Sequence, residues 1–332
     1  MRQRAPPPRE KPGARRAGDS RLTAVDRERK LMSTPSLAVQ LTTPELKLLQ
    51  ALIYQECGMY FDERRMHFLQ NRLLGRLKEC RLDSFYSYYR LLISADGKQE
   101  MSRLLEDLTV NETSFFRSKP QLDLFHKYLL DDILQAKQAK GDYSLRFWSA
   151  GCSTGQEPYT LAMLVADGLA YYCLRNPSAF PGAYPKPLVP PPWKVEILAS
   201  DINYSVLRAG EEGIYSESQM ASVDYSYRLR YFDKVGERYA VKKQVKELVH
   251  FDFHNLKTQY QPQGNDAIFC RNVMMYFDQP EQKRLIEKFR RCLNPHGYLF
   301  VGHAESLRGL SDKFAMVHRN SGTGYQRIEE VG

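Results

Sequence analysis

The chain has 332 residues, of which 42% are hydrophobic and 26% are charged, a composition typical of a folded protein with a buried core. It has no run of about 18 apolar residues, so we expect no membrane-spanning helix and no direct insertion into a membrane. The net charge of +9 is uneven: residues 1–30 hold ten basic and four acidic side chains, and the mildly basic remainder argues against a nucleic-acid partner.

Residues 1–35 are rich in proline, arginine and glycine and have no apolar period, which predicts a disordered basic tail. Met32 leads directly into the first helical pattern. Two interpretations therefore stay open: residues 1–31 are a native flexible tail, or the native protein begins at Met32.

The six cysteines indicate a reducing compartment. None forms a CxxC pair and no histidine cluster accompanies them, so we do not expect a structural zinc site. Three of them lie in strongly apolar patterns typical of buried thiols. We therefore expect the protein in the cytoplasm.

Residues 42–110 show helical patterns only, which predicts an all-helical N-terminal domain. The first helix begins at Thr43-Pro44-Glu45, with Thr43 as N-cap and proline at the first helical position. A second helix begins near Asp62. Two shorter helical patterns follow at Ser84–Ile93 and Lys98–Thr109.

From about residue 120 strands alternate with helices, which predicts an α/β domain with a doubly wound, Rossmann-like parallel sheet. The predicted strands are Ser144–Ala150, Lys194–Ser200, Ala267–Arg271 and Tyr298–Gly302, and the predicted helices are Gln121–Lys140, Glu157–Leu174, Asn203–Glu212 and Gln279–Leu293. Residues 176–192 are proline-rich and predict a loop, and residues 294–297 (NPHG) predict the end of the last helix.

Residues 214–251 interrupt this alternation. Short runs at Arg228–Phe232, Tyr239–Val241 and Glu247–Phe251 are separated by Gly236 and charged turns. This pattern predicts a small antiparallel β-subdomain inserted into the α/β domain.

A glycine-rich turn, Gly151–Gly155 (GCSTG), follows the first predicted strand. Glycines let the backbone approach a ligand closely at the carboxyl end of a strand, where open α/β sheets bind ligands. No lysine follows the last glycine, so the turn is not a P-loop and a triphosphate is disfavoured. On its own the turn fits either a ligand site or a simple tight turn.

Asp201 stands at the end of the second predicted strand. An acid in this place commonly binds the two ribose hydroxyls of a nucleoside ligand. The alternative is an N-cap for the helix at 203–212.

Two further segments flank the predicted pocket. Residues 111–117 (NETSFFR) connect the helical and α/β domains, and in residues 270–278 (CRNVMMYFD) a buried strand becomes polar. A polar cluster at the carboxyl end of a strand is where this architecture places its site. The alternatives are an interdomain packing seam for the first segment and core aromatics for the second.

Residues 42–330 closely resemble the chemotaxis receptor methyltransferases, the CheR-type protein-glutamate O-methyltransferases. The four motifs follow one another in the same order as in that family. The resemblance implies a methyltransferase domain over residues 111–332 with the β-subdomain inserted at about 214–251. It implies S-adenosylmethionine (SAM) as cofactor, S-adenosylhomocysteine as product, glutamates of methyl-accepting receptors as substrates, and a monomer.

The resemblance also implies roles for individual residues. Asn111, Thr113 and Arg117 would line the cofactor site, with Gly151 in its floor; Glu157 would hold the methionine part and Asp201 the ribose; Asn255 and Leu256 would border the adenine; and Arg271, Asn272 and Tyr276 would complete the site near the methyl group. A glutamate is ionised at neutral pH, so its methylation needs no general base. We therefore predict that Arg117 and Tyr276 are the catalytic residues and orient the carboxylate without transferring a proton.

The second helix, residues 62–81, is strongly basic. Its basic side chains are Arg64, Arg65, His67, Arg72, Arg76, Lys78 and Arg81, against only two glutamates. We expect it to dock the helical cytoplasmic region of a receptor together with the β-subdomain; a charged face that only meets solvent is the alternative. Two other functions stay open: methylation of a receptor in another signalling pathway, and a non-catalytic adaptor that retains the fold.

Overall fold

The structure is a computed structural model that describes residues 41–180, 187–260 and 262–329. The predicted basic tail at 1–35 lies outside the described residues, as does part of the predicted loop at 176–192. Among the described helices, none has the length and apolar character needed to cross a bilayer.

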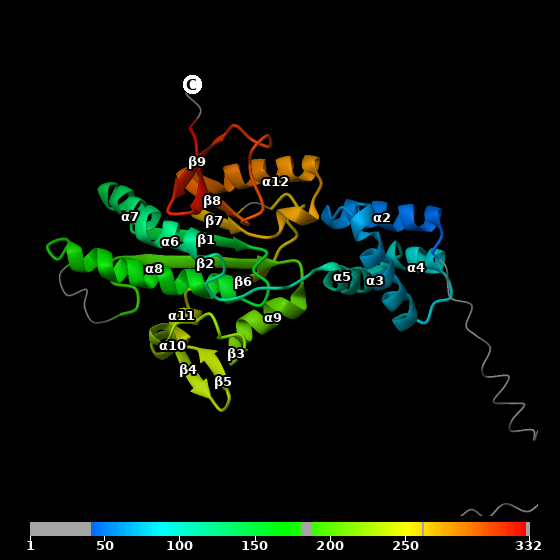
Figure 1. The fold of residues 1–332 in the computed structure, drawn as a ribbon, viewed down its shortest axis with the longest axis horizontal. Coiled ribbons are helices and arrows are strands. Elements are labelled where there is room, and N and C mark those ends of the chain that lie inside the picture. Colours follow the sequence, from blue (N-terminus) through cyan, green and yellow to red (C-terminus); the bar gives the residue numbers. More distant parts are fainter. Residues whose placement is uncertain (1–40, 181–186, 261, 330–332) are drawn as a thin grey trace, which may run out of the picture. The chain divides into compact units, whose positions relative to one another are not determined.

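The N-terminal part is helical, as the sequence predicts (Figure 1). It contains α2 (Thr43–Cys57), η1 (Glu63–Arg65), α3 (Met66–Glu79), α4 (Phe85–Leu92), η2 (Ala95–Gly97) and α5 (Lys98–Leu108). The N-cap of α2 is Thr42 rather than the predicted Thr43, and Thr42 forms a capping box with Glu45. Leu49, Ile53 and Leu73 are fully buried, so the apolar faces of the helices form this core.

The second part is built on a seven-stranded sheet in the order β6-β2-β1-β7-β8-β10-β9. The strands are β1 (Ser144–Ala150), β2 (Lys194–Asp201), β6 (Val249–Phe253), β7 (Asn265–Cys270), β8 (Leu293–Val301), β9 (Phe314–Arg319) and β10 (Gly322–Arg327). The first five in this order pair in parallel, and β10 is antiparallel to both neighbours. The predicted doubly wound sheet is therefore confirmed.

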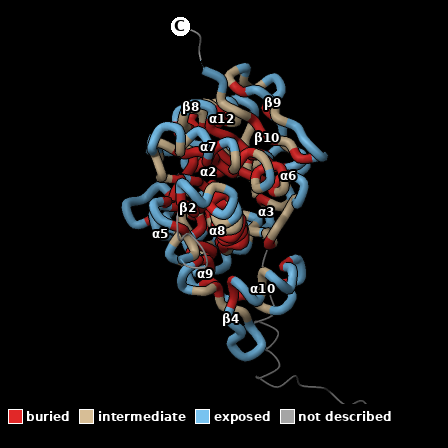
Figure 2. Tube along the Cα trace, turned by 90° about the vertical axis from the view of Figure 1, so that its left-hand side faces the viewer, coloured by how far each residue is buried: buried red, intermediate tan, exposed pale blue. Residues whose placement is uncertain are grey.

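Helices cover both faces of this sheet. They are α6 (Lys119–Leu124), the π-helical turn η3 (Phe125–Leu129), α7 (Leu130–Ala139), α8 (Gln156–Arg175), α9 (Tyr204–Glu212), η4 (Met274–Tyr276) and α12 (Gln279–Cys292). Phe147, Phe269 and Phe300 share one core with α6, α7 and α8, whereas Trp148 and Leu299 share the other with α12. Side chains that alternate across the strands thus form two apolar layers, and Figure 2 shows buried residues along α8 and the sheet.

The predicted antiparallel subdomain is a three-stranded sheet in the order β3-β5-β4. Its strands are β3 (Ile214–Ser216), β4 (Phe232–Val235) and β5 (Arg238–Val241), accompanied by α10 (Tyr225–Tyr231) and α11 (Lys243–Lys246). Two predictions here were wrong. Arg228–Phe232 is mostly helix α10, and residues 249–251 of the predicted strand Glu247–Phe251 belong to β6 of the main sheet, parallel to β2.

The C-terminal region differs from the prediction in two ways. The last helix ends at Cys292, close to its predicted end, but β8 begins at Leu293 rather than at the predicted Tyr298, so residues 294–297 lie within the strand, with a register irregularity where β8 pairs with Asn265 and Ala267. The hairpin β9–β10, which completes the sheet, has no counterpart among the predicted strands.

Candidate functional site

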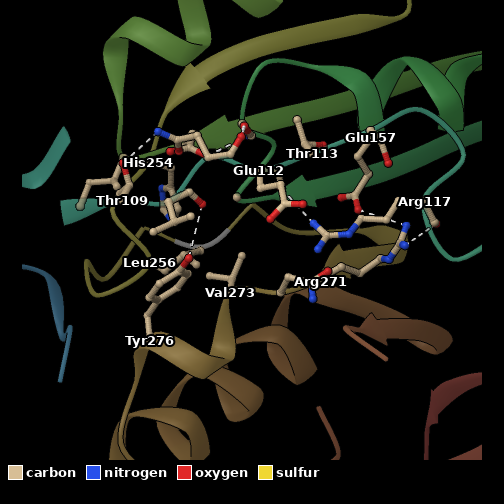
Figure 3. A pocket seen from close by; sticks show the side chains of 18 of the residues that line it. Thr109, Glu112, Thr113, Arg117, Glu157, His254, Leu256, Arg271, Val273 and Tyr276 are labelled. Atoms are coloured by element: carbon tan, nitrogen blue, oxygen red, sulfur yellow. Dashed lines mark hydrogen bonds and ion pairs between the residues drawn. The ribbon is translucent and has the colours of Figure 1, made fainter. Parts of the chain in front are cut away.

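A pocket opens at the carboxyl edge of the sheet, next to the point between β1 and β7 where the strand order reverses. It encloses about 990 Å³, including its open mouth. Ten of the eleven residues predicted for the site line it: Asn111, Thr113, Arg117, Gly151, Glu157, Asp201, Leu256, Arg271, Asn272 and Tyr276. The eleventh, Asn255, does not. Of the ten, Figure 3 labels Thr113, Arg117, Glu157, Leu256, Arg271 and Tyr276.

The glycine turn forms one wall of the pocket. Gly151 has φ +85°, and a Cβ there would lie 2.4 Å from the Cγ2 atom of Val273, which also lines the pocket. The N–H groups of Gly151 and Cys152 both donate to the carbonyl of Ser200, at 2.8 and 3.0 Å. Only glycine allows this turn to pass so close to the segment after β7.

Asp201 lies at the pocket wall with 8% of its surface exposed. Its Oδ2 accepts the N–H of Ser153 at 2.9 Å and its Oδ1 accepts the N–H of Asn203 at 3.0 Å. Burial raises the pKa of Asp201, and these backbone hydrogen bonds oppose the rise. The alternative role is wrong, because the side chain that caps α9 is that of Asn203, which accepts from Val206.

Glu157 and Arg271 form a buried ion pair in the pocket, with 3.3 Å between Oε2 and Nη1. Ser149 donates to the other carboxylate oxygen of Glu157 at 2.7 Å, and Nη2 of Arg271 donates to the carbonyl of Arg117. Burial raises the pKa of Glu157 and lowers that of Arg271, and each charge opposes the shift of the other. Nε of Arg271 is buried and has no hydrogen-bond partner among the described residues.

The segment 111–117 is tied to the glycine turn. The hydroxyl of Ser153 donates to the carbonyl of Asn111 at 3.0 Å, and Nη1 of Arg117 donates to the carbonyl of Glu112 at 2.9 Å. Phe115 is fully buried and packs edge-on against Tyr215 of the small sheet. The segment therefore supplies both core packing and pocket lining.

The segment after β7 is held by a single carboxylate. Glu305 accepts the N–H groups of Asn272 and Met275 at 3.0 and 3.1 Å, in addition to that of Gly302. This fixes the turn that carries Tyr276 into the pocket lining. Burial raises the pKa of Tyr276, whose hydroxyl donates to the carbonyl of Val110 at a long 3.4 Å.

Asn255, which was predicted to border the adenine, is not among the residues that line the pocket. Its Nδ2 donates to the carbonyl of Glu56 in α2 at 2.8 Å, so its side chain joins the loop after β6 to the helical domain. The neighbouring residues His254 and Leu256 do line the pocket.

Several lining residues were not predicted. Glu112 and Ser153 lie inside the recognised motifs, where their neighbours were chosen instead. Cys57 and Met59 come from the helical domain, and Met59 forms an antiparallel bridge with Phe277. No local pattern marks these two as site residues, because only the folded chain brings them to the sheet edge.

The fold and the pocket together define an α/β protein with a pocket at the carboxyl edge of its sheet, where proteins of this architecture bind nucleoside-containing ligands. Residues 44–109 match the family model described as "CheR methyltransferase, all-alpha domain", and residues 111–176 and 188–323 match "CheR methyltransferase, SAM binding domain". The chain belongs to the CheR methyltransferase family, and S-adenosylmethionine is its cofactor.

Named relatives span nearly the same length. The chain is 35% identical over 292 residues to the chemotaxis protein methyltransferase of Escherichia coli strain K12, covering 86% of this chain and 92% of the relative. It is 31% identical over 277 residues to the chemotaxis protein methyltransferase of Borreliella burgdorferi, covering 82% and 92%. The helical and α/β parts are thus matched together.

Proposed function

We propose that this enzyme transfers the methyl group of SAM to glutamate side chains of chemotaxis receptors and forms glutamyl methyl esters. One observation carries the proposal. The two candidates for orienting a carboxylate, Arg117 and Tyr276, line the same pocket as the acid Asp201 and the ion pair of Glu157 and Arg271.

The lining fits the cofactor. The methionine end of SAM carries an ammonium and a carboxylate, which match the opposite charges of Glu157 and Arg271. The buried Nε of Arg271 still lacks a partner, and a ligand carboxylate would supply one. Asp201 would accept the ribose hydroxyls with lone pairs that its backbone hydrogen bonds leave available. Leu256 would contact the adenine.

To promote this reaction, the protein has to align the carboxylate with the methyl group of SAM and to exclude water from both. Bound SAM supplies an electrophilic methyl carbon on a sulfonium. An incoming glutamate is already ionised, so no residue has to remove a proton. Arg117 has donors beyond the one that binds Glu112, and Tyr276 stays a neutral donor because burial raises its pKa. Together they would orient the carboxylate, which is worth several kcal/mol of the barrier.

We also propose that α3 docks the receptor, with a correction to its composition. Arg76 is 5% exposed and pairs with Glu100 at 2.7 Å and with Glu79 at 2.6 Å, so its predicted part in docking was wrong. The exposed basic side chains are His67, Arg72 and Lys78 on α3, with Arg64 just before it and Arg81 just after it. An acidic receptor helix would meet these charges. The open edge strands β3 and β4 of the small sheet offer a second contact by strand addition.

Such a substrate places the enzyme in the cytoplasm, where receptor signalling regions lie. The proposed reaction uses residues of one chain only, and we propose a monomer as the active unit. The described cysteines are all free thiols.

The test is transfer of labelled methyl from SAM to receptor-containing membranes, followed by mild base. We expect label in receptors that is released as methanol, because carboxyl methyl esters hydrolyse in base. Label that survives base would contradict ester formation, and label in a different protein would favour another signalling substrate. Tight SAM binding without any transfer would favour the adaptor.

A further inference from the structure

One side chain of the helical domain reaches a predicted catalytic residue. Cζ of Arg65 lies 4.9 Å from the centroid of the Tyr276 ring and 4.8 Å from that of Phe61, so the guanidinium contacts both rings. Arg65 is the last residue of η1 and directly precedes α3. It is partly buried, unlike the exposed Arg64 beside it.

Backbone contacts hold the two partners in this arrangement. Nη1 of Arg65 donates to the carbonyl of Tyr60 at 3.1 Å, and the N–H of Tyr60 donates to the carbonyl of Tyr276 at 2.9 Å. The bridge between Met59 and Phe277 extends this pairing by one residue on each side. Arg65 is therefore fixed to the same short ladder that carries the Tyr276 backbone.

The hydroxyl of Tyr276 does little to fix its own ring. Its hydrogen bond to Val110 is 3.4 Å long, near the limit at which such a bond contributes. The torsion that turns a tyrosine ring is also broad. A cation packed on the ring face favours one orientation of the ring, so Arg65 is a stronger restraint than the hydroxyl contact.

We propose that Arg65 is a positioning residue for methyl transfer, which holds the Tyr276 ring so that its hydroxyl meets the incoming carboxylate. The inference rests on the proposed function and assigns part of the active site to the helical domain. Because α3 begins at the next residue, a receptor docked on α3 contacts the helix that directly follows Arg65.

The charge of Arg65, like its packing, favours a hydrogen bond from the Tyr276 hydroxyl to the carboxylate. It opposes the rise in the Tyr276 pKa that burial produces, which makes the hydroxyl a better hydrogen-bond donor. If Arg65 only bound the receptor, removing it would leave the hydrogen-bonding strength of the Tyr276 hydroxyl unchanged.

The kinetic test compares Arg65→Met and Arg65→Lys with Arg90→Met, which removes an exposed charge from α4 of the same domain. A cation–π contact of this kind corresponds to roughly a tenfold effect on rate. We expect Arg65→Met to lower kcat about tenfold with the receptor KM and the SAM Kd within about twofold. Arg65→Lys should recover part of the loss, and Arg90→Met should resemble the wild type.

The same change made in a Tyr276→Phe background separates positioning from docking. If Arg65 acts through the hydroxyl, Arg65→Met should cost no more than about twofold in kcat there. A loss that appears in the receptor KM alone, or that persists in full without the hydroxyl, would overturn the proposal.

A spectroscopic readout makes the test independent of turnover. In protein labelled with ¹³C at tyrosine Cζ, the Tyr276 signal is identified by its disappearance in Tyr276→Phe. We expect it to shift in Arg65→Met and not in Arg90→Met, and an unchanged signal would overturn the proposal. If Arg65→Met does not fold, Arg65→Gln, which also removes the cation, provides the same comparison. A wild type that transfers no methyl to receptors overturns the proposed function instead, while the signal still reports the contact.

Discussion

The Nη1 atom of Arg271 lies 3.3 Å from Oε2 of Glu157, and both side chains line the pocket at the switch between β1 and β7. Glu157 follows β1 and Arg271 follows β7. The ion pair therefore forms because these two strands lie side by side in the sheet. Under the proposed function, it places one anion and one cation where the zwitterionic end of SAM would bind.

Breaking this pair should weaken cofactor binding strongly. In Arg271→Met, Glu157 keeps its hydrogen bond from Ser149 but loses its buried counter-ion. Removing one partner of a buried pair costs about 3–5 kcal/mol. We expect SAM affinity to fall by at least tenfold in calorimetric titration. Arg146→Met removes an exposed arginine that pairs with Glu196, and it should bind SAM like the wild type.

Asp201→Asn should weaken SAM binding and loosen the glycine turn. The amide removes the charge and turns a donor toward one of the two backbone N–H groups that Asp201 now accepts. An unpaired buried N–H costs about 1–3 kcal/mol. We expect a higher SAM Kd and a lower melting temperature. Asp252→Asn, on the exposed part of β6, is the matched control, and equal affinities of the two variants would exclude Asp201 from binding.

Tyr276→Phe should separate binding from transfer. The variant keeps the ring that Arg65 contacts and loses only the hydroxyl. We expect an unchanged SAM Kd and a kcat lower by at least about tenfold, because one orienting hydrogen bond to a charged group is worth roughly 1.5–3 kcal/mol. A variant that transfers methyl groups at the wild-type rate would remove Tyr276 from the mechanism.

Local sequence signals predicted the elements that carry the pocket. Ser144–Ala150 has the predicted bounds in the structure, because an apolar run followed by a glycine turn specifies a strand end by itself. The position of Asp201 was predicted in the same way, because it ends the apolar run that forms the next strand. Most predicted site residues stand next to such strand ends, which is why they line one pocket.

The misplaced elements depend on partners far along the chain. The run that forms β6 has the same short pattern whether it pairs antiparallel in an insertion or parallel with β2. The direction of the Asn255 side chain is set by Glu56 of the helical domain, and the place of Arg65 by Tyr276. No local pattern encodes these contacts.

Charge reversal on the exposed face of α3 should affect receptor binding alone. We expect Arg72→Glu combined with Lys78→Glu to raise the receptor KM severalfold without changing the SAM Kd, because both side chains are exposed. The effect should shrink at high salt. Arg90→Glu on α4 combined with Lys98→Glu on α5 changes the net charge by the same amount at exposed positions and is the control. An unchanged KM would mean that the basic face of α3 only meets solvent.

Lys288 gives the protein a pH-dependent stability. It is 3% exposed, and its Nζ donates to the carbonyls of Leu256 and Thr258 and lies 3.0 Å from Nε2 of His254. Burial lowers its pKa from 10.5 to about 8; Cys292 opposes this shift and Arg284 adds to it.

Between pH 8 and 10.5 the unfolded chain therefore binds more protons at this position than the folded chain. The contribution of Lys288 to the free energy of unfolding should rise with pH across this window and stay constant below it. The measurement is denaturant unfolding of the wild type and Lys288→Met from pH 7 to 10. Subtracting the two curves removes the titration of other groups, and a difference that does not rise above pH 8 would show that Lys288 keeps an ordinary pKa.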